Sequence, residues 1–238
     1  MDGSDVLTLL NGPSRGGPRA VIVRHAARHP IEDIRRSLEV GLTEQGMEDA
    51  ERFGRSLRGY RLRLFHSPAV RCRETAEAIR RGAEAAGALV SLVSPEPALC
   101  APYLKDDACL AEASRLGKGF IRAWFDGQFP ERWICRPSVA ADMVLGPVLA
   151  RLSEPGGEGR LDIHVSHDWE ISLLREELLG VRHEEAGWPA YLDGITLSWE
   201  VDEASARWRS AERRFRFEGG RRVSDEARSF GAPPQRDK

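Results

Sequence analysis

The sequence contains no long hydrophobic run. Its N-terminal apolar stretch, residues 6–10, is too short for the core of a signal peptide or for a membrane span. We therefore expect a soluble, cytoplasmic protein with no membrane partner.

The chain also lacks an excess of charge of one sign. Its 35 basic and 37 acidic residues give a formal net charge of -2, and neither sign forms a long block. This balance argues against bulk electrostatic binding to nucleic acid, so no nucleic-acid partner is expected. Lysine occurs only at Lys105, Lys118 and Lys238, so arginine supplies nearly all the positive charge. Arginine abundance by itself therefore identifies no anion site.

Cysteine pairs with metal-site spacing are absent as well. Four cysteines are scattered through the chain without a CxxC pair, at Cys72, Cys100, Cys109 and Cys135. In a reducing compartment, isolated cysteines are most often small buried apolar residues. Neither a disulfide framework nor a zinc site is indicated.

What the sequence does contain is an alternation of strand and helix patterns. Short apolar or alternating runs predict strands at 20–23, 61–66, 88–93, 161–165 and 195–201, with further short strands at 206–210 and 214–217. Apolar residues spaced three and four apart predict helices at 44–57, 69–87, 139–152 and 169–180. Thr43 is the expected N-cap of the first helix, and Met47 is expected on its buried stripe. The fold class is therefore α/β: a three-layer α/β/α sandwich with a mostly parallel central sheet and a small inserted lid.

The domain organisation follows from where this alternation is interrupted. Residues 1–19 form an N-terminal lead, and 20–217 form one domain. The proline-rich segment at about 94–137 breaks the pattern and is expected to be an inserted lid, whose aromatic residues at helical spacing pack a core rather than floor a substrate pocket. Residues 218–238 are polar and rich in glycine and proline, which predicts a flexible tail.

Two strands are each followed directly by polar residues that can do chemistry. The stretch VIVRHAARHP runs from a strand into Arg24 and His25, and the strand at 161–165 runs into His167 and Asp168. In parallel sheets, ligands bind beyond the carboxyl ends of the strands. We therefore expect both pairs of residues at the same edge of the sheet, although they are far apart in sequence.

The residue types at this edge suit a phosphoryl group. Arg24, Arg28 and Arg71 offer planar forks that match phosphate oxygens, and His25 on a rigid strand end can be oriented as a nucleophile. Nearby cations disfavour the charged imidazolium, so they would lower the pKa of His25 and keep it neutral. The same cations would stabilise charge on a transferring phosphoryl group.

Four motifs, read in order, resemble one known family. VIVRHAARHP is similar to the RHGxRxP signature of the histidine phosphatase superfamily, and GLTEQG is similar to its LTxxG element. HSPAVRCRETA resembles its second phosphate-binding arginine segment, and VSHDWEISLLREELLG resembles its His-Asp motif. The resemblance covers about residues 21–180, implies a phosphoglycerate mutase-like fold, and is closest in motif to the histidine acid phosphatase branch.

Carried over to this sequence, the resemblance implies a role for each matching residue. His25 would attack phosphorus and form a phosphohistidine, and Asp168 would act as general acid. Phosphate would be held by Arg24, Arg28, Arg71 and His167. The implied activity is a metal-independent phosphatase that needs no cofactor and acts on a small phosphorylated metabolite.

Two positions depart from the family pattern. Ala26 replaces the usual glycine, a small change. Ala27 stands where the mutase branch usually carries glutamate, which argues against mutase activity.

The identity of the acid and of the substrate contacts stays open. The mutase-like branch takes its acid from a segment after the third strand, where Glu96 and Asp106 are alternatives to Asp168, although Glu96 precedes Leu99 rather than following it. Tyr103 and Lys105 are candidate substrate contacts. His66 either lines the pocket or only satisfies loop backbone.

Other classes of function also stay open. The spacing of several histidines could suit a metal, but no HExxH helix is present and Pro30 ends the turn after His29. The main alternatives are a non-catalytic module that binds a phosphorylated ligand on the same fold, and a protein phosphohistidine phosphatase. The sequence identifies neither the substrate nor the oligomeric state.

Overall fold

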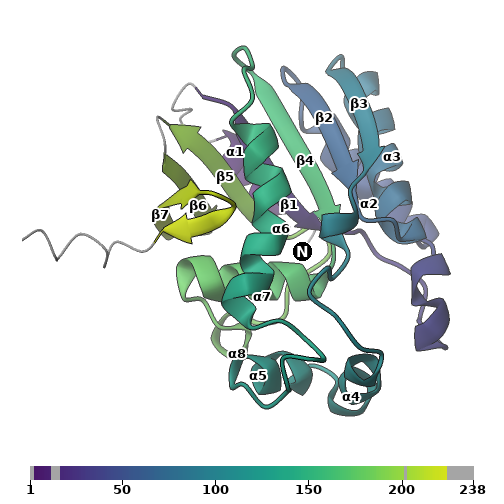
Figure 1. The fold of residues 1–238 in the computed structure, drawn as a ribbon. Helices are drawn as coiled ribbons and strands as arrows, with labels where there is room; N and C mark the ends of the chain where they lie inside the picture. Colours follow the sequence, from purple (N-terminus) through teal and green to yellow (C-terminus); the bar gives the residue numbers. More distant parts are fainter. Residues whose placement is uncertain (1–2, 12–16, 201–202, 224–238) are drawn as a thin grey trace, which may run out of the picture.

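The chain folds around one twisted sheet, which is seen in a computed structural model that describes residues 3–11, 17–200 and 203–223 (Figure 1). The sheet has eight strands in the order β3-β2-β4-β1-β5-β6-β7-β8. The strands are β1 (Arg19–Arg24), β2 (Arg61–His66), β3 (Leu89–Pro95), β4 (Arg160–Ser166), β5 (Gly194–Glu200), β6 (Glu203–Trp208), β7 (Ala211–Glu218) and β8 (Arg221–Val223).

The sheet is mixed, which corrects the expectation of a mostly parallel one. Strands β3, β2, β4 and β1 run parallel, whereas the pairings from β1 through β5 to β8 are all antiparallel. The connections from β5 to β8 span only a few residues. Such short connections permit antiparallel neighbours only, since a parallel pair needs a long crossover.

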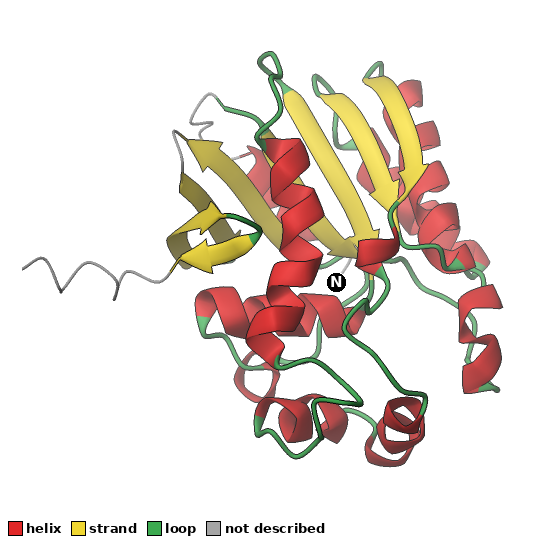
Figure 2. Cartoon of the chain, viewed as in Figure 1, coloured by secondary structure: helices red, strands yellow, loops and turns green. Residues whose placement is uncertain are grey.

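Helices cover both faces of the sheet and make the predicted three layers. One face carries α1 (Ser4–Asn11), α2 (Glu44–Arg55) and α3 (Val70–Ala85), and the other carries α6 (Pro137–Leu152) and α7 (Asp168–Leu179) (Figure 2). Shorter helical segments lie outside these layers: η1 (Ile34–Glu39), η2 (Pro97–Leu99), α4 (Ala108–Leu116), α5 (Gly119–Phe125) and α8 (His183–Ala186).

Strand β1 shows why its sequence is a continuous apolar run. Val21 and Val23 pack into the core beneath α2 and α3, while Ala20 and Ile22 pack into the core beneath α6 and α7. A strand buried on both faces needs apolar side chains at every position rather than alternation. The rigidity of β1 follows from this double burial.

Most predicted helix boundaries are confirmed within one or two residues. Thr43 is the N-cap of α2, and its side chain accepts a hydrogen bond from the Gly46 amide. The prediction for Met47 is wrong, because this side chain is exposed. Helix α1 lies in the N-terminal lead, where the sequence predicted no element. Strand β8 lies in the segment predicted as a flexible tail, and the part of the tail from 224 to 238 is outside the described residues.

The inserted segment forms a small helical layer beyond the carboxyl ends of the parallel strands (Figure 1). Its aromatic side chains pack inward, as expected: Phe120 and Trp124 are fully buried, and Trp124 stacks on Tyr103 at 4.8 Å between ring centroids. The lid is therefore held to the domain by a continuous apolar core.

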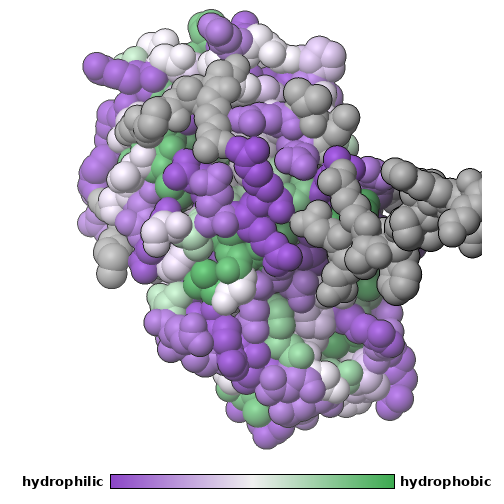
Figure 3. Space-filling model, turned by 90° about the vertical axis from the view of Figure 1, so that its left-hand side faces the viewer, coloured by the Kyte–Doolittle hydropathy of each residue, from purple (hydrophilic) through white to green (hydrophobic). Residues whose placement is uncertain are grey.

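The outer surface is mostly polar. On the face turned toward the viewer in Figure 3, hydrophilic residues dominate and hydrophobic residues form small separate patches. Within the described ranges, no helix combines the length and apolar character that crossing a membrane requires.

Candidate active site

Neighbouring strands β1 and β4 bring the two predicted histidines together. The strands pair in parallel, with Arg24 opposite Ser166, and His25 and His167 follow them at the same edge. The two rings meet edge to face at 5.6 Å between centroids, and both side chains are buried. The His25 amide donates to the Ser166 carbonyl at 2.9 Å, which fixes the start of the loop. The expected convergence of residues 142 positions apart is thus found in the structure.

The hydrogen bonds of His25 define which ring nitrogen is free. Its Nδ1 lies 2.7 Å from the carbonyl oxygen of Ala26. A carbonyl can only accept, so Nδ1 carries the proton and donates, and Nε2 keeps its lone pair. The imidazole is therefore held in the tautomer that a nucleophilic Nε2 requires.

Burial and neighbouring positive charge keep His25 neutral. Desolvation lowers its pKa well below 6.5, and the adjacent His167 and Arg71 lower it further. The Ala26 carbonyl acts in the opposite direction, but its effect is smaller than that of burial. The uncharged form of His25 thus persists into acidic solution.

Arg71 and His167 form one buried hydrogen-bonded unit. The Arg71 guanidinium donates through Nη2 to His167 Nδ1 at 2.9 Å and through Nη1 to the Ser37 carbonyl at 2.5 Å. Because arginine only donates, His167 is protonated at Nε2, which donates to Ser67 Oγ at 2.8 Å. Burial and the charge of Arg71 lower the pKa of His167 well below 6.5, so it too is neutral.

Arg24 lies between Asp168 and the loop that precedes β5. Its Nη2 pairs with Asp168 Oδ2 at 2.9 Å, and its Nη1 donates to the Pro189 carbonyl at 2.6 Å. The guanidinium carbon lies 4.2 Å from the ring centroid of Tyr191. Asp168 accepts a second bond, from Trp188 Nε1 at 3.0 Å. Arg24 and Asp168 are therefore positioned by the same loop.

Arg28 lies further out, in the loop between β1 and α2. Its side chain is half-buried, and its Nη1 donates to the His29 carbonyl at 2.7 Å. Burial lowers the pKa of Arg71, and the charge of Arg28 adds to this effect. The charges of all three predicted arginines lower the pKa of His167, so the positive charge gathers around this ring and favours an anion there.

Two of these arginines also keep an unused donor. Arg24 Nε and Arg71 Nε are buried and have no hydrogen-bond partner among the described residues. An unsatisfied buried donor costs free energy that an acceptor can recover. Phosphate oxygens are suited to this, because they accept strongly from guanidinium groups.

The two alternative acids are not part of this constellation. Glu96 is the N-cap of η2, accepts from the Ala98 amide at 3.1 Å, and forms an ion pair with Arg151. Asp106 accepts from the Ala108 amide at 2.8 Å at the start of α4. Both carboxylates have structural partners, so the geometry leaves Asp168 as the carboxyl beside the histidines.

The remaining candidates also have local partners. Tyr103 is fully buried and donates to Glu170 Oε1 at 3.2 Å, so it offers no surface to a substrate, contrary to expectation. Lys105 is exposed and donates to the Glu131 carbonyl at 2.8 Å. His66 is bonded through Nδ1 to the carbonyl of the next residue at 2.9 Å, which matches its interpretation as a residue that satisfies loop backbone.

Several contributors were missed in the sequence. The loop containing Trp188 and Tyr191 is one of them, because no chemical task for either ring could be read from the sequence. Tyr191 lies 5.8 Å from His25 between ring centroids, and Trp188 binds Asp168. Glu170 follows Asp168 by two positions in α7 and is buried. Its position in the predicted helix gave no sign that the side chain is buried.

A group with metal-ligand chemistry lies away from this site. Ligand atoms of Glu176, His183 and Glu184 lie within 4.8 Å of one another. Arg122 already pairs with both carboxylates, at 2.7 Å and 2.6 Å, so a metal would have to displace a guanidinium. No residue of this group contacts the histidine site through a described hydrogen bond.

Comparisons with known proteins support the fold. A model of the histidine phosphatase superfamily (branch 1) matches residues 20–90. Comparison with curated proteins finds no match.

Solved structures share the fold at low sequence identity. A mycobacterial glucosyl-3-phosphoglycerate phosphatase in complex with VO3 is 23% identical, covers 83% of this chain and 97% of its own, and has a TM-score of 0.52. Its complex with inorganic phosphate is 22% identical, covers 83% and 94%, and has a TM-score of 0.50. YhfR of Bacillus stearothermophilus is 18% identical, covers 88% and 96%, and has a TM-score of 0.51.

These findings confirm the predicted resemblance to the histidine phosphatase superfamily and the three-layer fold. The matching model is that of branch 1, whereas the motifs had pointed to the acid phosphatase branch. The His-Asp motif at His167 and Asp168 lies beyond the matched residues.

Proposed function

We propose that this protein is a metal-independent phosphatase that hydrolyses a small phosphomonoester through a phosphohistidine on His25. The observation that carries the proposal is the orientation of His25, whose Nδ1 donates to the Ala26 carbonyl and leaves Nε2 free, with the charges of Arg71 and Arg24 acting on the ring. No step in this proposal requires a metal or an organic cofactor.

In the first step, His25 Nε2 attacks phosphorus and the bond between phosphorus and the ester oxygen breaks. Asp168 gives its proton to the departing alkoxide, which leaves as an alcohol. In the second step, Asp168 removes a proton from water, the oxygen attacks phosphorus, and the bond between phosphorus and Nε2 breaks. Two easier steps replace one difficult displacement.

The arginines would stabilise the charge on the phosphoryl oxygens in both steps. Arg71 Nε and Arg24 Nε are the buried donors that currently lack a partner. The ion pair of Arg24 with Asp168 implies a further rearrangement: a bound phosphoryl group would compete with Asp168 for Arg24 Nη2. Asp168 would then be freer to exchange a proton with the leaving group.

The test is turnover of p-nitrophenyl phosphate together with detection of the phosphoenzyme. His25→Ala should abolish both phosphate release and the acid-labile, base-stable phosphate adduct expected of phosphohistidine. His29→Ala is a matched control, because His29 lies exposed in the same loop and has no role in the proposal. Circular dichroism establishes that each variant folds.

Two outcomes would exclude the proposed mechanism. One is phosphate release that survives His25→Ala, and the other is activity that a chelator removes and added metal restores. Oxyanion binding without turnover of any phosphomonoester would instead favour the alternative of a module that only binds phosphorylated ligands.

A further inference from the structure

Glu170 is a buried carboxyl that the proposed mechanism does not use. It lies in the first turn of α7, and its side chain is almost fully buried. Its Oε1 accepts from the Ala101 amide at 2.8 Å and from the Tyr103 hydroxyl at 3.2 Å. Its Oε2 is buried and finds no hydrogen-bond partner in the part of the chain that the structure describes.

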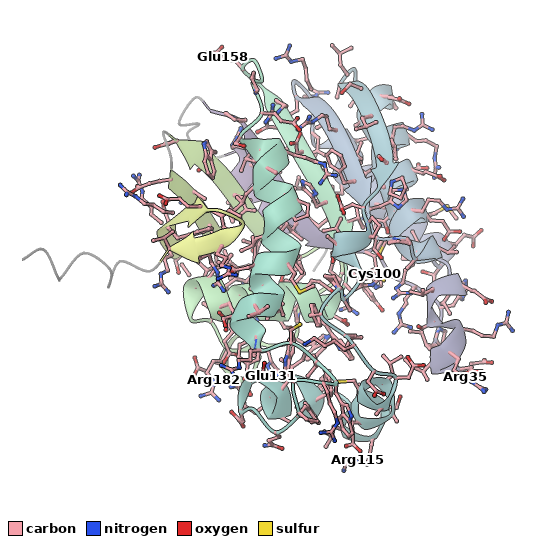
Figure 4. The ribbon with its side chains drawn as sticks, in the orientation of Figure 1. Arg35, Cys100, Arg115, Glu131, Glu158 and Arg182 are labelled. Carbon is pink, nitrogen blue, oxygen red and sulfur yellow. The ribbon has the colours of Figure 1, made fainter. Side chains whose placement is uncertain are left out.

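The residues bonded to Glu170 belong to the first segment of the lid. We refer to residues 99–103 as the lid base; Cys100, labelled in Figure 4, lies within it near the carboxyl ends of the parallel strands. The lid base is also bonded to β4, because Ser166 Oγ donates to the Leu99 carbonyl at 2.8 Å. Beyond it, Tyr103 continues into the lid core by stacking on Trp124.

These two attachments lie on either side of the site residues. Ser166 and Glu170 hold the lid base, and His167 and Asp168 come between them in sequence. The turn that bears His167 and Asp168 is thus connected to the lid at both ends. Movement of the lid base would therefore change the positions of His167 and Asp168.

The surroundings of Glu170 favour its neutral form. The titratable groups that face it are Asp168 on its own helix, Cys100 and Tyr103 in the lid base, and Cys72 on α3. Each of these is neutral or negative, so none compensates a negative charge on Glu170. Burial raises the pKa of Glu170 to about 7, and the charge of Asp168 adds to the effect, whereas the hydrogen bonds that Glu170 accepts from its own amide, the Ala101 amide and the Tyr103 hydroxyl oppose it and are outweighed by burial.

We propose that Glu170 is a positioning residue whose protonated side chain docks the lid base beside His167 and Asp168, and whose ionisation releases it. In the docked state the carboxyl is neutral and bonds two lid-base donors. When the lid base opens, water reaches the carboxyl, which can then ionise. Release of the lid base is thereby coupled to the loss of one proton.

The difference in the pKa of Glu170 between the docked and open states determines how strongly opening depends on pH. In water the carboxyl ionises near its ordinary pKa of about 4.3, so the open state loses its proton before the docked state does. The opening constant should therefore rise about tenfold per pH unit between about pH 4.5 and 7, and should level off above.

Amide hydrogen exchange of the full-length protein tests this directly. Peptides that cover the lid base are followed from pH 5 to 8 by mass spectrometry, and protection is corrected for the intrinsic pH dependence of exchange. Wild-type protection should fall about tenfold per unit up to pH 7. Glu170→Gln, which keeps an acceptor for both donors but cannot ionise, should show nearly constant protection.

Two further variants and one control segment make the result specific to Glu170. Tyr103→Phe removes one donor to Glu170 and should lower protection while keeping the slope. Glu112→Gln removes a half-buried lid carboxyl on α4, which pairs with Arg115 on the same helix, and should change nothing. Peptides from β4 should keep much higher protection than the lid base at every pH, which separates local opening from global unfolding.

The proposal is overturned if wild-type protection of the lid base does not vary with pH, a result that needs no variant. It is equally overturned if Glu170→Gln keeps the wild-type slope. The docking does not depend on phosphatase activity, so the same slope is expected in the inactive variant His25→Ala.

One consequence does rest on the proposed function. If His167 and Asp168 act on a phosphoryl group, Glu170→Gln should extend turnover of p-nitrophenyl phosphate to higher pH than the wild type. Failure of turnover in all variants would count against the proposed function, whereas an unchanged exchange slope in Glu170→Gln would count against the docking alone.

Discussion

Single contacts at His25 determine which chemistry this site can perform. The Ala26 carbonyl selects the Nδ1-protonated tautomer, and the Ala26 amide in turn donates to Thr75 Oγ1 at 3.1 Å. Thr75 also donates to the carbonyl of Arg71, one turn earlier in α3. The loop of the nucleophile and the start of α3 at Arg71 are therefore connected through one side chain, that of Thr75.

The lowered pKa of His25 predicts that kcat/KM falls only at a lower pH than is usual for a catalytic histidine. For a histidine with the ordinary pKa of 6.5, the fraction of molecules with a neutral ring would be about tenfold lower at pH 5.5 than well above the pKa. Because burial and adjacent cations lower the pKa of His25 well below that value, kcat/KM for p-nitrophenyl phosphate should not fall between pH 7 and 5.5. The measurement is the pH profile of kcat/KM. An acid limb with its midpoint near 6.5 would show that the nucleophile is not held as described.

Arg71 should be the most sensitive of the three arginines, because it also orients His167. Arg71→Ala is expected to lower kcat/KM on the order of a hundredfold or more, by analogy with the loss of a single oxyanion donor. Arg71→Lys should recover little of this, since the single ammonium nitrogen cannot reproduce the planar fork in which Nη1 bonds Ser37, Nη2 bonds His167 and Nε remains free.

The control for Arg71 lies on the same helix. Arg81→Ala removes an exposed arginine that pairs with Glu51 and should leave kinetics unchanged. Competitive inhibition by inorganic phosphate separates a binding defect from a rate defect. Comparable losses in Arg71→Ala and Arg81→Ala would mean that helix stability, and not the guanidinium, is responsible.

At the level of elements, α2 supports the catalytic loop by close backbone contact. The Thr43 amide donates to the Ala27 carbonyl at 3.0 Å, and the first turn of α2 packs against that carbonyl at Gly46. A Cβ on Gly46 would lie 2.0 Å from the Ala27 oxygen, far inside van der Waals contact. Gly46, the last residue of GLTEQG, therefore permits α2 to approach the loop between His25 and Arg28.

Gly46→Ala should consequently displace the loop as well as destabilise the protein. Overpacking of this kind costs about 1–3 kcal/mol, and each kcal/mol lowers the melting temperature by about 2–4 °C in a chain of this size. The KM for p-nitrophenyl phosphate should rise in parallel. Gly119→Ala is the control, because a Cβ there meets nothing within 4 Å. Unchanged melting and KM in Gly46→Ala would show that the loop does not depend on this contact.

The elements also show which parts of the fold were predictable. Thr43 and Gly180 mark the start of α2 and the end of α7, because caps act through adjacent backbone and can be seen in sequence. The antiparallel half of the sheet was not predicted, since pairing partners are chosen by tertiary contacts and not by local pattern. Met47 was predicted to be buried, but its side chain is exposed, because periodicity alone does not determine where the buried stripe of a helix ends.

Across the whole molecule, the lid and the sheet are joined through buried polar groups as well as apolar packing. Glu170 joins α7 to the lid base, and Ser166 joins β4 to it. Apolar contacts around Phe120 and Trp124 hold the lid at any pH, whereas the contact of Glu170 depends on a proton. Global stability should therefore respond to pH through this residue.

The stability prediction compares wild type with Glu170→Gln. The raised pKa of Glu170, about 7, means that the unfolded chain releases this proton first as pH rises. The contribution of Glu170 to stability is full below about pH 4.3, declines up to pH 7, and is constant above. The wild type should thus lose roughly 3 kcal/mol relative to Glu170→Gln over this window.

Urea unfolding at pH 4.5, 5.5, 6.5 and 7.5 measures this difference, and comparison with Glu170→Gln cancels the other titrating groups. Equal pH dependence of the free energy of unfolding in the two proteins would show that Glu170 is not held in its neutral form.

The sequence by itself determined the class of fold, the two strand ends that carry histidine, and the arginines around them, because apolar runs, caps and motif residues act locally. Tertiary structure alone decided the tautomer of His25, the pairing of Arg24 with Asp168, and the burial of Glu170 against the lid base. Those properties depend on which groups from distant segments exclude water from one another, and no local pattern specifies that.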